Sequence, residues 1–205
     1  MSRVGASQTE ELLAQARSGD AAALGRLLER FRAYLMLLAR IHIGRRLQRK
    51  VDEADLVQET FLEAHRAFPR FRGASEPEFI GWLREILAAR LAMQLRQYYG
   101  TQRRDVVRER DLVAELDESS LLISRAFIAS GTSPSMQAQE REQAVVLADA
   151  LERLSADHRQ VLVYRHLEGL TFPEVATRMG RSVDAVEKLW ARALIQLRRE
   201  LPEDR

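Results

Sequence analysis

The most regular pattern in this chain lies at residues 55–96, which are DLVQETFLEAHRAFPRFRGASEPEFIGWLREILAARLAMQLR. Its first part repeats apolar residues at helical spacing and follows Asp52, a favourable N-cap residue, so it predicts an amphipathic helix. The apolar face comprises Val57, Phe61, Ala64 and Phe68. The opposite face is mostly polar and comprises Asp55, Gln58, Glu59, Leu62 and Glu63.

A loop and a second helix follow. Pro69 and Gly73 are expected to end the first helix. The loop carries two aromatic residues that are expected to be exposed, Phe68 and Phe71, among Arg70 and Arg72. A second helix is predicted to open near Pro77, to bury Phe79, Trp82, Leu83 and Ile86, and to turn basic at Arg90, Arg96, Arg103 and Arg104. Such a pair of helices is suited to bind a protein on one side and nucleic acid on the other.

Plain structural explanations exist for each of these features. The polar face is also what a solvated helix surface looks like, and Trp82 is also a natural core residue. Phe68 and Phe71 are equally suited to fasten the loop to the core. If the loop instead holds an unstacked base, each stacking contact contributes roughly 1–3 kcal/mol.

Composition narrows the class of protein. The 205 residues suffice for one or two small domains, and they include 46% hydrophobic residues and no cysteine. Lacking cysteine, the chain has no disulfide framework and no thiolate metal site or nucleophile. It has no apolar run of the roughly 18–20 residues that a membrane span needs and no apolar signal core, so we expect a cytoplasmic protein. The four histidines are scattered, and no cofactor, metal or catalytic motif is predicted.

The rest of the chain predicts an all-α fold. Before the first motif, Asp20 is expected to cap one helix that continues to Gly44. After it, residues 105–118 are predicted to form a short helix, whereas residues 119–128 show no clear period. Residues 129–135 have loop composition. We therefore predict two small helical domains, an N-terminal helical bundle (1–100) and a C-terminal helix-turn-helix (143–205), joined by a partly ordered linker (101–142).

The C-terminal helix-turn-helix is predicted from LTFPEVATRMGRSVDAVEKLW, residues 170–190. Thr171 and Glu174 have capping-box spacing, Gly180 suits a left-handed turn residue, and Ser182 is the expected cap of the second helix. Val183, Val186 and Leu189 are predicted to face inward. This arrangement is typical of DNA-binding helix pairs, although trihelical cores of this kind also serve protein contacts alone.

The motifs DLVQETFLEAHRAF, FRG and FxxWLxxI resemble the second conserved region of bacterial sigma factors of the extracytoplasmic-function (ECF) type, and the helix-turn-helix resembles their fourth region. The resemblance implies partners: core RNA polymerase, promoter DNA and a possible anti-sigma factor. It implies that Asp55, Gln58, Glu59, Leu62 and Glu63 bind the clamp helices of the largest subunit. It further implies contact between the C-terminal domain and the polymerase flap.

The DNA contacts implied by the resemblance fall into two sets. For the minus-ten element they are Phe68, Arg70, Phe71, Arg72, Trp82, Arg90, Arg96, Arg103 and Arg104. For the minus-thirty-five element they are Arg181, Ser182, Asp184, Glu187, Lys188 and Arg192. The family commonly carries Asn and Asp on the basic helix where this chain has Ala89 and Met93, so reading of the minus-ten element is expected to rest more on the loop.

The linker acids form a further set: Asp111, Glu115, Asp117 and Glu118. The resemblance implies that they follow a positively charged path inside polymerase. Taken together, the chain is predicted to be a sigma factor and not an enzyme. The alternatives are a helix-turn-helix regulator that binds an operator without polymerase, and a protein-binding helical adaptor.

Overall fold

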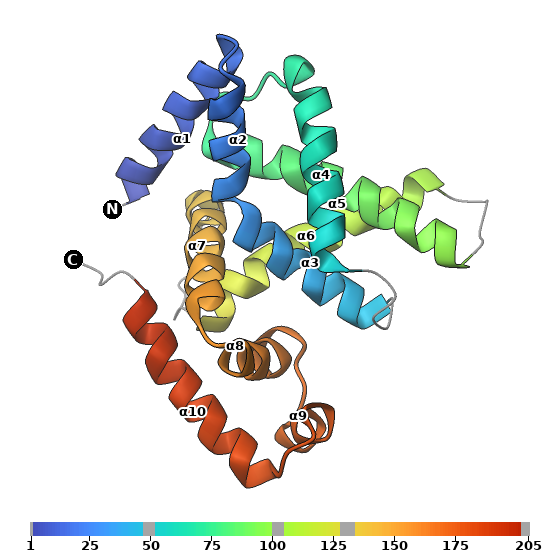
Figure 1. The fold of residues 1–205 in the computed structure, drawn as a ribbon, viewed down its shortest axis with the longest axis vertical. Helices are drawn as coiled ribbons and strands as arrows, with labels where there is room; N and C mark the ends of the chain where they lie inside the picture. The colour runs from blue at the N-terminus through green and yellow to red at the C-terminus, as the bar shows by residue number, and fades with distance from the viewer. Residues whose placement is uncertain (1, 47–51, 100–104, 128–133, 202–205) are drawn as a thin grey trace. The chain divides into compact units, whose positions relative to one another are not determined.

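The computed structural model describes residues 2–46, 52–99, 105–127 and 134–201. Within these ranges every regular element is helical, which confirms the predicted all-α fold (Figure 1). The chain divides into two compact units, Met1–Glu118 and Ser119–Arg205. No helix in these ranges has both the length and the apolar composition to cross a bilayer.

Within the described residues, the first unit contains five α-helices, one 3-10 turn and the start of a sixth α-helix. They are α1 (Ser2–Arg17), α2 (Ala21–Arg30), α3 (Arg32–Arg46), α4 (Glu53–Ala67), the 3-10 turn η1 (Phe68–Arg70), α5 (Glu76–Tyr99) and the N-terminal part of α6 (Asp105–Phe127). Asp52 caps α4 as predicted, because its carboxylate accepts a hydrogen bond from the backbone N–H of Ala54 at 2.7 Å.

The prediction of a single helix from Asp20 to Gly44 is wrong, because the helix is interrupted at Phe31. Phe31 ends α2 with φ −99° and ψ 4°, and its ring lies 5.6 Å from that of Phe79 in α5. Both rings are fully buried. The two helices therefore meet at an aromatic contact that periodicity along one segment does not reveal.

The linker segment is more regular than predicted. Instead of a short helix ending at residue 118, α6 runs without a break to Phe127. Leu112, Leu116 and Ile123 are buried on one side of it. The loop prediction for residues 129–135 lies mostly outside the described residues, and α7 (Pro134–Arg153) starts at Pro134. The division into residues 1–100, 101–142 and 143–205 stays a prediction.

The second unit carries the helix-turn-helix. After α7 come α8 (Ala156–Leu162), the π-helical turn η2 (Val163–Leu167), α9 (Phe172–Met179) and α10 (Val183–Glu200). The capping box at Thr171 and Glu174 and the Ser182 cap are both present, and Gly180 has φ +64°. These three predictions are confirmed.

One inward position of the helix-turn-helix was predicted wrongly. Val183 is 38% exposed, whereas Val186 is fully buried and Leu189 is half-buried. Val183 is the first residue of α10, directly after the Ser182 cap. At this position the side chain precedes the turn that packs on α9, so apolar spacing alone overestimates its burial.

Candidate functional site

The predicted polymerase-binding face lies on α4. Asp55, Gln58 and Leu62 are exposed, whereas Glu59 and Glu63 are half-buried. Leu62, the apolar residue of this face, is 52% exposed. The α4 surface therefore combines polar side chains with one apolar side chain that the fold does not use.

Two of the three acids of this face also contact α5. Arg90 donates to the Glu63 carboxylate at 2.5 Å, and the Gln94 amide donates to Glu59 at 3.3 Å. Arg90 was predicted to touch DNA and Glu63 to touch polymerase. The Glu63–Arg90 ion pair thus links a residue of the predicted polymerase-binding face on α4 to a residue of the predicted DNA-binding set on α5.

The aromatic residues of the predicted minus-ten site form a packed cluster. The Phe71 ring stacks on Trp82 with centroids 4.7 Å apart, and Phe68 lies 6.3 Å from Trp82. Phe79 lies 5.6 Å from Phe71 and 5.5 Å from Trp82. The expectation that both loop rings are exposed is wrong for Phe68, which is buried because it continues the apolar face of α4. Phe71 and Trp82 are half-buried, so their edges remain accessible.

The basic residues of the same site lie in several places. Arg70 and Arg72 are exposed beside the cluster, and Arg96 is half-buried. The places of Arg103 and Arg104 lie outside the described residues. Ala89 is half-buried, and Met93 is 50% exposed, so an apolar side chain stands on the surface where the resemblance expects an acid.

The predicted minus-thirty-five residues come together on α10. All six predicted residues are exposed, over the turn before α10 and its first three turns: Arg181, Ser182, Asp184, Glu187, Lys188 and Arg192. Lys188 donates to Asp184 at 2.8 Å, and Arg181 pairs with Asp157 of α8. Exposed pairs of this kind contribute at most about 1 kcal/mol, so phosphate groups compete with them easily.

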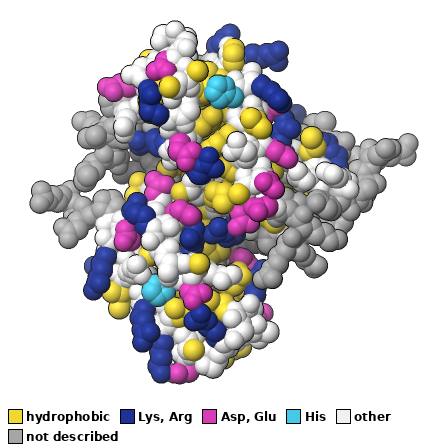
Figure 2. Space-filling view, viewed as in Figure 1, with side chains coloured by type: hydrophobic (Ala, Val, Ile, Leu, Met, Phe, Trp, Pro, Cys, Tyr) yellow, Lys and Arg dark blue, Asp and Glu magenta, His cyan; other side chains and the backbone are white. Residues whose placement is uncertain are grey.

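The charges around these residues are mixed. Figure 2 shows acidic and basic side chains interspersed over the described part of the face in view, with hydrophobic side chains between them. The formal net charge of the whole sequence is only +2. Since nonspecific DNA affinity grows with the number of phosphates neutralised, this distribution favours weak, salt-sensitive DNA binding.

A histidine behind α10 fixes one face of that helix. The Trp190 indole N–H donates to His166 Nε2 at 2.9 Å, and the two rings stack with centroids 6.1 Å apart. Burial, and to a lesser degree the neighbouring Arg165, hold the pKa of His166 below its usual value of 6.5. A lowered pKa keeps this imidazole neutral, which is the form able to accept the Trp190 hydrogen bond.

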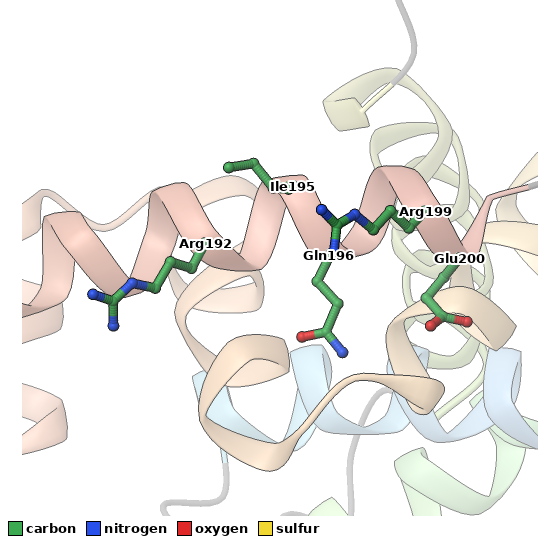
Figure 3. Close-up of a pocket in the computed structure, with 5 residues that line it drawn as sticks. All are labelled: Arg192, Ile195, Gln196, Arg199 and Glu200. Atoms are coloured by element: carbon green, nitrogen blue, oxygen red, sulfur yellow. The ribbon is translucent and has the colours of Figure 1, made fainter.

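The C-terminal half of α10 carries a shallow hollow of about 400 Å³ lined by Arg192, Ile195, Gln196, Arg199 and Glu200 (Figure 3). Gln196 is bonded to His158 and Glu200 to Arg153. All lining residues come from one helix, so the hollow has no second wall to enclose a ligand. In the part of the chain that the structure describes, no three His, Asp or Glu side chains gather at metal-binding distance.

Sequence reasoning missed one residue beside the aromatic cluster. Arg17, at the end of α1, donates to the Gly73 carbonyl and lies over the Phe71 ring. It is 56 positions from Gly73 in sequence. No local pattern marks it, because the contact depends on how α1 packs in the unit.

One unit therefore carries an exposed polar helix beside an aromatic loop, and the other carries a helix-turn-helix, so the structure is that of a helical protein with two motifs. The model of the ECF sigma factor family matches residues 6–203, and the chain belongs to this family. It is an RNA polymerase sigma factor, a protein that directs transcription initiation. The match covers both motifs, and neither alternative function is favoured.

Individual relatives give the same assignment. The chain is 29% identical over 192 residues to the ECF RNA polymerase sigma factor SigD of Mycobacterium tuberculosis, covering 94% of this chain and 83% of SigD. It is 31% identical over 195 residues to the RNA polymerase sigma factor CnrH of Cupriavidus metallidurans, covering 94% of both. The solved structure of CnrH in complex with the cytosolic domain of CnrY is similar with 26% identity and a TM-score of 0.32, covering 94% of this chain and 96% of that one.

Proposed function

We propose that the first unit docks on the clamp helices of the largest polymerase subunit through the exposed face of α4. Three features support this. The face is exposed although it contains Leu62, its polar residues Asp55 and Gln58 do not serve the core, and its order relative to the aromatic loop matches the family. Burying an exposed leucine in an interface contributes roughly 1.5–3 kcal/mol, so Leu62 is the expected centre of the contact.

Promoter recognition is divided between the two units. In the proposal, the exposed parts of the Phe71 and Trp82 rings contact an unpaired base of the minus-ten element, and Arg70 and Arg72 meet its backbone. The N-terminal turns of α10 enter the major groove of the minus-thirty-five element, where Lys188 faces phosphate. Catalysis then belongs to the polymerase, and the protein acts in the cytoplasm.

The single observation that carries this proposal is that one family match spans residues 6–203, and so includes both recognition modules. Each module alone grips DNA weakly. When polymerase fixes their separation, the second contact becomes intramolecular and its effective concentration rises. The flap contact of the second unit and an anti-sigma partner stay predictions that rest on the resemblance.

In-vitro transcription from genomic fragments, with purified core polymerase and with or without this protein, tests the proposal. We expect specific transcripts only when both are present. Leu62→Asp is expected to lower core affinity at least about tenfold, because a charge would be buried in the interface. Glu11→Ala, on the exposed surface of α1, is the control and is expected to behave as the wild type.

Two outcomes contradict the proposal. If core polymerase does not bind the wild-type protein, the proposed docking through α4 is wrong. Tight binding of the free protein to a promoter duplex in a gel-shift assay identifies it instead as a regulator that needs no polymerase.

A further inference from the structure

The connection between α4 and α5 is held from outside by α1. Arg17 donates from Nη2 to the carbonyl of Gly73, and the centre of its guanidinium lies 5.9 Å from the centroid of the Phe71 ring. In Figure 1 this connection passes beside the α1–α2 turn, where α1 ends. One side chain therefore contacts both the backbone of the connection and the aromatic ring proposed to meet DNA.

The Phe71 ring has little room to move within this arrangement. A Cβ atom at Gly73 would lie 2.5 Å from Cζ of Phe71, so the ring rests directly against the Gly73 backbone. The ring also stacks on Trp82 with centroids 4.7 Å apart, and its centroid lies 5.6 Å from that of Phe79. Arg17 fastens the Gly73 peptide and also covers the ring, which keeps the ring between glycine and tryptophan.

The residues after Gly73 are fixed from inside the connection. The Glu78 carboxylate accepts hydrogen bonds from the Ala74 N–H at 2.8 Å, the Ser75 N–H at 3.0 Å and the Ser75 hydroxyl at 2.8 Å. The bonds from Ser75 and Ala74, together with the charge of Arg17, lower the pKa of Glu78. The carboxylate thus stays charged and keeps these bonds at neutral pH.

A second contact from α1 reaches Glu76, the first residue of α5. Thr9, fully buried, donates to the Glu76 carboxylate, and Arg30 of α2 lies 3.8 Å from the same group. Helix α1 therefore contacts the second half of the connection and the start of α5, through Arg17 at Gly73 and through Thr9 at Glu76. A helix outside both recognition motifs sets the shape of the segment.

We propose that Arg17 is a positioning residue for promoter reading: it holds Phe71 against Trp82 so that the exposed part of this ring pair is ready to receive an unpaired base. The inference rests on the proposed function of the loop. Without Arg17 the connection samples more conformations, and the entropy of ordering it must be supplied when the base is captured. The affinity for melted strand should then fall although no DNA contact has been removed.

The experiment uses holoenzyme reconstituted from core polymerase and the full chain. Its affinity for a fluorescent single-stranded oligonucleotide carrying the non-template minus-ten element is measured by anisotropy. We expect Arg17→Ala to lower this affinity about tenfold, within the range that one base–aromatic stack contributes. Affinity for core polymerase is expected to be unchanged. Arg26→Ala, which removes an exposed arginine of α2 paired with Asp20, is the matched control.

Arg17→Lys separates positioning from a direct phosphate contact. Lysine keeps the charge but lacks the planar group that covers the ring and reaches the carbonyl together, so we expect the affinity to stay reduced and the salt dependence of binding to stay that of the wild type. Full recovery with lysine, together with a shallower salt dependence for Arg17→Ala, would assign Arg17 to phosphate and overturn the inference.

A second variant keeps the inference testable if Arg17→Ala fails to fold. Gly73→Ala pushes the Phe71 ring from the opposite side, and it is expected to weaken oligonucleotide capture while leaving core affinity unchanged. If either folded variant binds the oligonucleotide with wild-type affinity, the inference about Arg17 is overturned, whereas the proposed function is not. A wild-type protein that binds neither core nor oligonucleotide overturns the proposed function as well.

Discussion

The ion pair between α5 and α6 allows a quantitative prediction about the stability of the first unit. Arg84 lies 2.8 Å from Asp117, and their side chains are 7% and 32% exposed. Two unit charges about 4 Å apart interact by about 4 kcal/mol at an effective dielectric constant near 20. Exposure of Asp117 to water reduces this figure to about 2 kcal/mol. We therefore expect Asp117→Asn to destabilise the unit by about 2 kcal/mol.

The assay follows unfolding of this unit alone. The sequence contains two tryptophans, Trp82 in the first unit and Trp190 in the second. In a Trp190→Phe background, fluorescence of Trp82 reports thermal unfolding of the first unit. About 2 kcal/mol corresponds to a fall in its midpoint of about 6–12 °C for a unit of this size.

Two further variants sharpen the test. Asp111→Asn neutralises an exposed acid of the same helix and is expected to shift the midpoint by less than about 2 °C. The double change Arg84→Met with Asp117→Leu is expected to recover much of the loss, because it leaves no buried charge. Equal midpoints for Asp117→Asn and Asp111→Asn would refute the reasoning.

Three further predictions concern the Glu63–Arg90 ion pair, helix α10 of the helix-turn-helix, and His166, which accepts a hydrogen bond from α10. Glu63→Arg or Arg90→Glu alone should reduce transcription several-fold, while the double exchange recovers part of it in the same run-off assay. Lys188→Ala with Arg192→Ala should weaken minus-thirty-five binding by holoenzyme and reduce the salt slope by about 1–2, as measured across a salt series. Because the folded-state pKa of His166 is lowered, the unfolded chain binds more protons than the folded protein below about pH 6.5. The contribution of His166 to the free energy of unfolding is therefore fully present above that pH and is lost as the pH falls below it. Thermal unfolding measured from about pH 7.5 to about pH 5.5 should show this loss of stability, and His166→Gln should make the pH dependence flatter.

Local patterns were sufficient to predict several helix ends. The Asp52 and Ser182 caps, the Thr171–Glu174 capping box and the left-handed Gly180 were all predicted correctly. Each depends on residues at most three apart, whose side chains satisfy the free N–H groups of a helix start or allow a turn after a helix end. The exposed face of α10 followed from helical spacing for the same reason.

Contacts between distant segments were not predictable in this way. Phe31 at the helix break contacts Phe79, the Phe68 ring lies near Trp82, and Arg17 donates to the Gly73 carbonyl. Periodicity shows which face of a helix is apolar but not which element covers it. The sequence therefore predicted the modules, whereas the joints that position the aromatic cluster required the structure.

Contacts within the first unit also change what is expected of the linker acids Asp111, Glu115, Asp117 and Glu118. Asp117 is paired with Arg84, and Glu115 lies 3.8 Å from the buried His42, so both are engaged within the first unit. For them to follow a charged path inside polymerase, as the family resemblance implies, both contacts would have to break, and Arg84 would lose its charged partner. Asp111 and Glu118 are exposed and carry no such cost. If linker acids act in initiation, neutralising Asp111 and Glu118 should therefore change promoter escape, whereas neutralising Asp117 should first change the stability of the fold.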